Sequence, residues 1–197
     1  MAIKPILFNT EMVRAILDGR KTCTRRLVKP QPDEKHTFPL GFVTDSTEKK
    51  EVGCFGFAAN EYGGSIQYVK PPYRYAPGDI LYVRETWKKA PNGYYYYEDW
   101  QRDDIADVTK WKPSIHMPKE AARIWLKVTN VRVERLQDMT DDDAEAEGCF
   151  DYTSTALGFP DVWDSTIKKS DLDRYGWDAS PWVWVIEFER CEKPETL

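Results

Sequence analysis

Residues 19–26 concentrate chemically useful side chains in one short stretch near the start of the chain. Its eight positions, Gly-Arg-Lys-Thr-Cys-Thr-Arg-Arg, hold four cationic residues and two hydroxyls. If the stretch is a strand, alternation places Thr24 and Arg26 on one face and Arg25 on the other. A strand beside a core normally buries one apolar face, so polar groups on both faces indicate a functional site. Such groups can supply a hydroxyl nucleophile and cationic donors that hold a carbonyl or a phosphate.

The elements that position this stretch are predicted from apolar periodicity and capping residues. Residues 3–8 are typical of a strand, and Asn9 or Thr10 can cap the helix that follows. This helix is predicted to end just before Gly19, because glycine suits the left-handed conformation that ends many helices. Residues 23–28 form the next predicted strand, so the cationic stretch connects a helix to a strand.

The later part of the chain is predicted to contain three strands, at residues 80–85, 121–135 and 182–189, and a helix at residues 140–148. The apolar phase of the longest strand slips at Thr129 and Asn130, which predicts a β-bulge. The helix has Thr140 as its N-cap and acids in its first turn, and Gly148 ends it. Alternating aromatic residues in the last strand are expected in the core.

Three long segments between these elements are interpreted as insertions, at about residues 30–76, 88–120 and 149–180. The first contains a weak hairpin signal, and the second contains a tyrosine run at residues 94–97 that we expect in a hairpin strand. The order of elements indicates a single α+β domain, mostly β, over residues 1–197. Its expected architecture is a small, partly closed β-barrel with two short helices.

Composition and charge exclude several classes of protein. The net charge of −5 argues against a non-specific DNA-coating protein, which would be basic overall. Four cysteines without a CxxC pair signal neither a zinc site nor a disulfide framework, and they fit a reducing cytoplasm. No long apolar run follows the first residues, so neither a signal peptide nor a membrane span is expected. No metal and no cofactor is implied.

The motifs, taken in order, resemble the ASCH domain, the activating-signal-cointegrator homology family with a PUA-like β-barrel. The resemblance rests on residues 17–26, on the Pro-Gly-Asp turn at 77–79 before a strand, on Glu147 in the acidic helix and on the closing strand at 185–188. These elements follow the family order and span nearly the whole chain. The insertions are similar to those of the longer ASCH proteins found in phages and prophages.

The resemblance implies an activity and a set of site residues. Members of the family include small bacterial amidohydrolases that cleave N4-acetylcytidine, and others are proposed to bind or cut RNA. In the amidohydrolases, a lysine and a threonine of this box act with a glutamate from the later helix. By resemblance the catalytic group is Lys21, Thr24 and Glu147, with Arg26 in support. The insertions decide whether the pocket is open, narrowed or blocked.

The chemistry of amide hydrolysis leaves two mechanisms open for these residues. It needs a nucleophile, a base, an oxyanion donor and an acid for the leaving amine. In one scheme neutral Lys21, favoured by burial and by neighbouring arginines, activates the Thr24 hydroxyl. In the other, Glu147 activates water and Lys21 stabilises the oxyanion. The residues do not choose between the two schemes.

A second group of candidate substrate-binding residues follows the strand at 80–85. Arg84, Glu85 and Trp87 lie at its end, and His116 is one of two histidines in the chain. Simpler interpretations are a salt-bridged strand edge for Arg84 and Glu85 and a satisfied buried histidine for His116, which we favour.

Simpler interpretations also apply to the cationic stretch, since charge runs usually face solvent. The main alternative function is a non-catalytic module of the PUA-like class that binds RNA or a modified base. A ribonuclease is a weaker alternative, because neither His36 nor His116 lies in a recognisable acid–base pair. The expected ligand is therefore a modified nucleoside or RNA.

Overall fold

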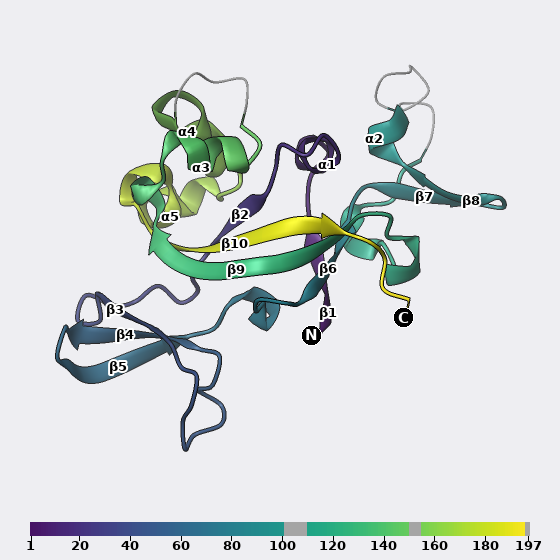
Figure 1. The fold of residues 1–197 in the computed structure, drawn as a ribbon. Coiled ribbons are helices and arrows are strands. Elements are labelled where there is room, and N and C mark those ends of the chain that lie inside the picture. The colour runs from purple at the N-terminus through teal and green to yellow at the C-terminus, as the bar shows by residue number, and fades with distance from the viewer. Residues whose placement is uncertain (101–109, 150–154, 196–197) are drawn as a thin grey trace.

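A five-stranded sheet forms the centre of the computed structural model, which describes residues 1–100, 110–149 and 155–195 (Figure 1). The strand order is β1 (Ile3–Leu7), β6 (Ile80–Arg84), β9 (Trp125–Arg135), β10 (Trp182–Cys191) and β2 (Cys23–Leu27). Strands β1 and β6 are parallel, whereas the other neighbours are antiparallel. Strands distant in the chain are thus paired at the centre of the molecule.

The predicted mixture of strands and helices, with strands in the majority, is confirmed. Strands β1 and β2 are the two edges of the sheet, so the part of the chain that the structure describes shows no closed barrel. The prediction of two helices was wrong. The described residues contain five α-helices: α1 (Thr10–Leu17), α2 (Tyr97–Trp100), α3 (Asp141–Ala146), α4 (Thr155–Ser165) and α5 (Leu172–Tyr175). The additional three lie in segments interpreted as insertions, which form secondary structure of their own.

The longest strand, β9, contains the predicted bulge. Asn130 lies opposite Glu187 and Val128 lies opposite Phe188, so Thr129 is an extra residue on β9. A bulge of this kind increases the local twist of the strand. The strand begins at Trp125 rather than at residue 121, because residues 119–121 form a 3₁₀ turn.

The last strand, β10, is buried on both faces. The four residues expected in the core, Trp182, Trp184, Ile186 and Phe188, pack in the main apolar cluster with side chains of β1, α1, β6 and β9. On the opposite face, Val183 and Val185 pack against Leu136, Phe159 and Trp163. This second layer consists of α3, α4 and α5 and their connections (Figure 1). Strand β2 lies beside β10, so the same helices also cover one face of β2. We call this the outer face, and the face directed toward the main apolar cluster the inner face.

The segments interpreted as insertions form two smaller sheets. Strands β3 (Phe38–Phe42), β4 (Phe55–Asn60) and β5 (Gly63–Val69) make one sheet, and it contains the predicted hairpin. This sheet projects from the central sheet (Figure 1), and Phe55 and Phe57 pack on the tryptophans of β10. Strands β7 (Trp87–Ala90) and β8 (Gly93–Tyr96) form a hairpin that contains most of the tyrosine run. Residues 101–109 and 150–154 of the expected insertions lie outside the described residues, and the single-domain organisation stays a prediction.

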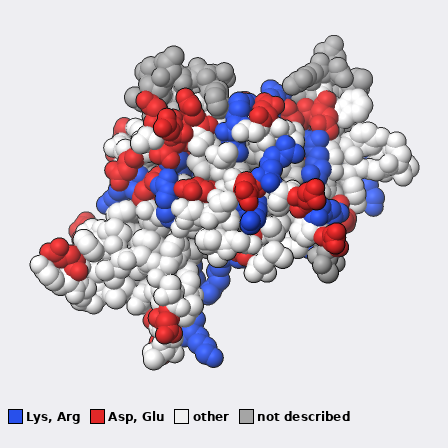
Figure 2. Space-filling model, viewed as in Figure 1, with Lys and Arg blue, Asp and Glu red and all other residues white. Residues whose placement is uncertain are grey.

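Charges of both signs are interspersed over the central sheet and its helices, whereas the visible surface of the β3–β5 sheet is largely uncharged (Figure 2). The side of the molecule drawn in Figure 2 shows no continuous basic surface of the kind with which proteins bind DNA non-specifically. Among the described residues, no helix is both long enough and apolar enough to cross a membrane.

Candidate functional site

The end of α1 fixes the backbone position of Lys21. The helix begins as predicted, with the Asn9 side chain accepting a hydrogen bond from the Met12 N–H at 2.8 Å. It ends as predicted, with Gly19 at a φ of +75°. The N–H groups of Arg20 and Lys21 then both donate to the Ala15 carbonyl, at 2.8 and 3.0 Å. Lys21 is therefore held directly against the last turn of the helix.

Strand β2 is held between β10 and the end of α3. Thr24 lies opposite Ile186 in the β2–β10 register. Just before the strand, the Thr22 N–H donates to the Ala146 carbonyl at 2.8 Å, and the Thr22 carbonyl accepts from the Phe188 N–H at 2.8 Å. These bonds bring the last residues of α3 beside the cationic stretch.

Helix α3 places Glu147 at this contact. Its N-cap is Thr140, and reciprocal bonds between Thr140 and Asp143 complete a capping box. Glu147 is the C-cap residue, and Gly148 follows with a φ of +90°. A Cβ atom at Gly148 would lie 2.8 Å from the Ala15 Cβ, so this position needs glycine for both conformation and space.

The structure brings Lys21 and Glu147 into direct contact. The Lys21 Nζ donates to the Glu147 Oε2 at 2.5 Å and to the Glu147 carbonyl at 2.8 Å. The Lys21 side chain is 0% exposed and the Glu147 side chain 4% exposed. Phe8 covers the pair, with its ring centre 5.6 Å from Nζ. Both contacts of the Lys21 Nζ are donated hydrogen bonds to Glu147, so this geometry uses Lys21 as a donor.

Thr24 and Arg26 lie together on the inner face of β2, the face directed toward the main apolar cluster. Thr24 is fully buried, and its Oγ1 accepts a hydrogen bond from the Arg26 Nη1 at 2.9 Å. The Arg26 Nη2 donates to the Leu7 carbonyl at 3.0 Å, so this side chain spans the two edges of the open sheet. Burial lowers the pKa of Arg26 below its ordinary value, although Glu147 opposes the change. An arginine nevertheless stays charged at any physiological pH.

Arg25 is a site residue whose contacts the sequence did not reveal. The simpler interpretation, that a charge run faces solvent, does not hold for Arg25, which is buried at 3% exposure. Its guanidinium contacts Glu134 at 2.7 Å, Asp143 at 3.2 Å and the Glu147 Oε1 at 3.5 Å. The physical reason is that α3 and α4 cover the outer face of β2. Alternation placed Arg25 on that face, but it could not show what covers the face.

The ionic contacts of Arg25 continue along β9 and β10. Arg132 forms ion pairs with Glu134, Asp143 and Glu187. Burial alone would raise the pKa of Asp143, but hydrogen bonds from Thr140 and the charge of Arg25 lower it below its ordinary value. Glu147 is therefore one end of a network that joins β2, α3, β9 and β10.

Cys23 shares the outer face of β2 with Arg25. Burial, and to a lesser extent the charge of Glu147, raises the pKa of the Cys23 thiol to about 12. The thiol is thus neutral at physiological pH and is no candidate nucleophile, because the reactive form is the thiolate.

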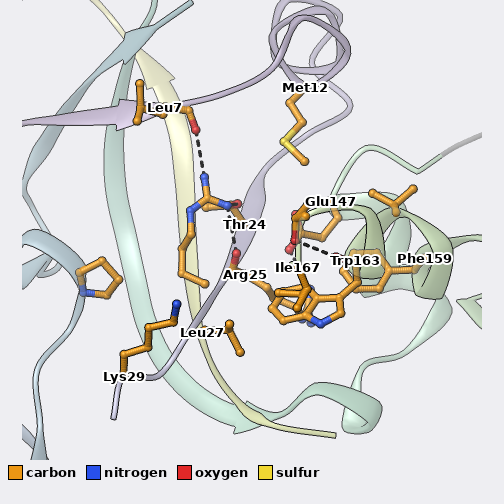
Figure 3. Close-up of a pocket in the computed structure, with 14 residues that line it drawn as sticks. Leu7, Met12, Thr24, Arg25, Leu27, Lys29, Glu147, Phe159, Trp163 and Ile167 are labelled. Atoms are coloured by element: carbon orange, nitrogen blue, oxygen red, sulfur yellow. Dashed lines mark hydrogen bonds and ion pairs between the residues drawn. The ribbon is translucent and has the colours of Figure 1, made fainter. Parts of the chain in front are cut away.

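A cavity of about 500 Å³ opens beside these groups. One wall is polar and contains Thr24, Arg25, Arg26 and Glu147. The facing wall is apolar and comes from Phe159 and Trp163 of α4 and from Ile167 just after this helix (Figure 3). The volume lies within the range of roughly 300–1,000 Å³ usual for small-molecule sites. An apolar wall opposite a few polar groups suits a flat, partly polar ligand.

The second group of candidate residues does not line this cavity. Arg84 donates to the backbone carbonyls of Ile115 and Met117. Glu85 is buried and forms two hydrogen bonds of 2.9 Å with Arg123. Burial raises the pKa of Glu85, and Arg123 opposes that change. The structure therefore gives Glu85 a salt bridge, but to Arg123, and gives Arg84 backbone partners instead of a salt bridge.

Trp87 and His116 also lie outside the cavity. Trp87 is 4% exposed and packs with Met117 and Trp125 in a separate apolar cluster. The expectation of a buried His116 was wrong, because the 3₁₀ turn Ser114–His116 lies at the surface. The neighbouring Met117 takes the buried position instead.

The described residues contain no group of three or more His, Cys, Asp or Glu side chains placed to hold a metal ion. The site thus consists of one lysine, one threonine, two arginines and one glutamate at the junction of β2 and α3. Comparisons of the chain with protein-family models, with curated proteins and with solved structures found no match, so the resemblance to the ASCH domain rests on its motif residues.

Proposed function

We propose that the protein is an amidohydrolase of the ASCH type, with a PUA-like fold, that removes the acyl group from N4-acetylcytidine or a related N-acylated nucleoside. The observation that carries this proposal is the buried contact between Lys21 and Glu147: Glu147 lines the cavity together with Thr24, and Lys21 lies behind it at 0% exposure. These residues are 126 positions apart in the chain and meet through the ends of α1 and α3.

The geometry favours water, activated by Glu147, as the nucleophile. The Lys21 Nζ donates to the carboxylate and to the carbonyl of Glu147, and Lys21 does not line the cavity, so its contacts are those of a donor rather than of a base for Thr24. Glu147 lines the cavity and can take a proton from water as the water oxygen bonds to the acyl carbon. The bond from that carbon to N4 then breaks, and the proton passes to the leaving amine. The products are cytidine and acetate.

The neighbouring donors can stabilise the charge that develops during this step. Arg26 lines the cavity and carries a full positive charge. The Thr24 oxygen accepts from Arg26, and its hydroxyl hydrogen can in turn be donated to an acceptor. Donors placed where negative charge develops contribute most in a water-poor site.

A specific observation supports a second candidate function, binding without hydrolysis. Both oxygens of Glu147 contact cations, Oε2 with Lys21 and Oε1 with Arg25. A carboxylate whose two oxygens both contact cations has fewer lone pairs left to accept a hydrogen bond from water. The same cavity would then bind a modified base between Arg26 and the apolar wall of α4.

Turnover of N4-acetylcytidine separates the two functions. Purified protein is incubated with the nucleoside, and cytidine and acetate are measured by chromatography. We expect Glu147→Gln and Lys21→Ala to lower kcat by about 100-fold or more, the usual scale of acid–base catalysis. Glu85→Gln is the matched control, because it alters another buried, arginine-paired carboxylate outside the cavity.

Two results would contradict hydrolysis. One is the absence of products with folded wild-type protein, and the other is unchanged turnover in Lys21→Ala. Tight binding of N4-acetylcytidine without products would favour the binding function instead.

A further inference from the structure

The cations beside the cavity differ in how their charges are balanced. Lys21 contacts the carboxylate of Glu147, and Arg25 contacts three carboxylates. Arg26, in contrast, forms no ion pair with any residue that the structure describes. Its three hydrogen bonds go to neutral oxygens, namely the Thr24 hydroxyl and the carbonyls of Arg25 and Leu7. A half-buried positive charge thus lines the cavity without a counter-ion.

Arg26 also keeps donors for a ligand. Its hydrogen bonds come from Nη1 and Nη2, so the Nε–H has no acceptor among the described residues. A guanidinium offers its donors in a planar fork that matches the oxygens of a phosphate or a carboxylate. Burial removes part of the hydration of the Arg26 guanidinium and thereby lowers its pKa, and a bound anion would compensate for this loss.

A second cation, Lys29, lies at the rim of the same cavity. It follows β2 three positions after Arg26, is exposed, and extends toward the cavity (Figure 3). Its Nζ lies 5.5 Å from the centre of the Tyr175 ring. Lys29, too, forms no ion pair within the described part of the chain. The lining therefore carries two cations, Arg26 and Lys29, without an ion pair among the described residues, whereas Arg25 is balanced by its carboxylates.

We propose that Arg26 and Lys29 bind a phosphate group, so that the natural ligand is an N-acylated nucleotide or nucleotide unit rather than a neutral nucleoside. The base portion of this inference rests on the proposed function. A neutral nucleoside would leave the excess positive charge of the cavity unbalanced, whereas a phosphate neutralises it. The phosphate can belong to a mononucleotide or to RNA, which share this chemistry.

Cytidine and its 5′-monophosphate, the expected products of hydrolysis, provide a binding test that does not depend on catalysis. Binding of cytidine, cytidine 5′-monophosphate and inorganic phosphate is measured by calorimetry with the wild-type protein. We expect the monophosphate to bind about 10- to 100-fold more tightly than cytidine, the scale of one or two charge-assisted hydrogen bonds. The preference should shrink as salt concentration rises, because exposed Lys29 is screened.

Two variants make the measurement specific. Lys29→Gln should reduce the preference for the phosphorylated ligand by about 3- to 10-fold, since it removes the cation at the rim. Lys49→Gln makes the same charge change at an exposed position outside the cavity and should leave the preference unaltered. Turnover of N4-acetylcytidine, its 5′-monophosphate and a short RNA with one acetylated cytidine then identifies the source of the phosphate.

The outcomes separate this inference from the proposed function. Equal affinity for cytidine and its monophosphate would overturn the phosphate site, and hydrolysis of the nucleoside would leave the proposed function intact. A preference for phosphate without any hydrolysis would support the phosphate site and overturn the hydrolase. A preference that Lys29→Gln leaves unchanged would exclude Lys29 from the site.

Discussion

Removing one member of the Lys21–Glu147 pair should cost more stability than removing both. Glu147→Met leaves the ammonium of Lys21 at 0% exposure without a carboxylate. Lys21→Met leaves Glu147 with one remaining cation, Arg25, at 3.5 Å. The double variant removes both buried charges and replaces them with flexible apolar side chains of similar length.

The magnitudes follow from the burial of the pair. Leaving one charge of a buried pair without its partner costs about 3–5 kcal/mol, and we expect this loss for Glu147→Met. Lys21→Met should cost about 1–3 kcal/mol, because Arg25 still stabilises the carboxylate. The double variant should lie within about 2 kcal/mol of the wild type, since apolar replacement of a buried pair is often nearly neutral.

The free energy of unfolding is measured by urea denaturation for all four proteins, with the slope m checked for constancy. The exposed pair Lys127–Glu189 provides a control cycle with the same substitutions. Its coupling should be below about 1 kcal/mol, as is usual for exposed pairs.

Additive losses in the double variant would refute this reasoning. They would mean that Lys21 and Glu147 do not interact across the contact, since coupled residues deviate from additivity. The proposed function adds a separate expectation, namely that the double variant is folded but does not hydrolyse N4-acetylcytidine. The effect of this pair on the free energy of unfolding can then be measured separately from its effect on turnover.

Two further predictions concern the surroundings of this pair. Gly148→Ala should lower the free energy of unfolding by about 2–4 kcal/mol, because the position has a positive φ and the new Cβ would overlap with Ala15. The control Gly78→Ala changes a glycine with a φ of +85° and open space around it, and it should cost about 1–2 kcal/mol. Equal losses for the two variants in urea denaturation would contradict the overlap. Burial raises the pKa of Cys23 to about 12 from 9.0, so the folded protein keeps a thiol neutral that the unfolded chain ionises. The contribution of the neutral Cys23 thiol to the free energy of unfolding is therefore fully present below about pH 9 and falls by up to about 1.4 kcal/mol per pH unit above it. Between about pH 8 and about pH 10, the free energy of unfolding should decrease more for the wild type than for Cys23→Ala. Equal losses in the two proteins would contradict this assignment.

Local elements could be predicted because neighbouring residues determine them. The cap at Asn9 and the left-handed Gly19 follow from side-chain chemistry within a few positions. The bulge at Thr129 follows from a change of apolar phase along one strand. The strand start at Trp125 was missed, because the apolar residues before it also suit a buried 3₁₀ turn.

Contacts between distant segments could not be predicted from periodicity. The meeting of Lys21 and Glu147 was expected through the family resemblance alone, since 126 positions separate them. The acids that surround Arg25 come from β9 and α3, and no local pattern links them to β2. Trp87 suits a stacking site and a buried cluster equally well by residue type, and the packing of Met117 against it decides for the cluster.

The arrangement of charges on the two faces of β2 gives the strand two different tasks. On the outer face, Arg25 is neutralised by carboxylates and fixes Glu147 through its Oε1. On the inner face, Arg26 has neutral partners and keeps its charge for the cavity. A charge that is already paired contributes to position, whereas an unpaired charge is available to a ligand. Adjacent arginines of identical chemistry therefore differ in their contacts, and we expect Arg25 to orient the candidate base and Arg26 to select the ligands of the cavity.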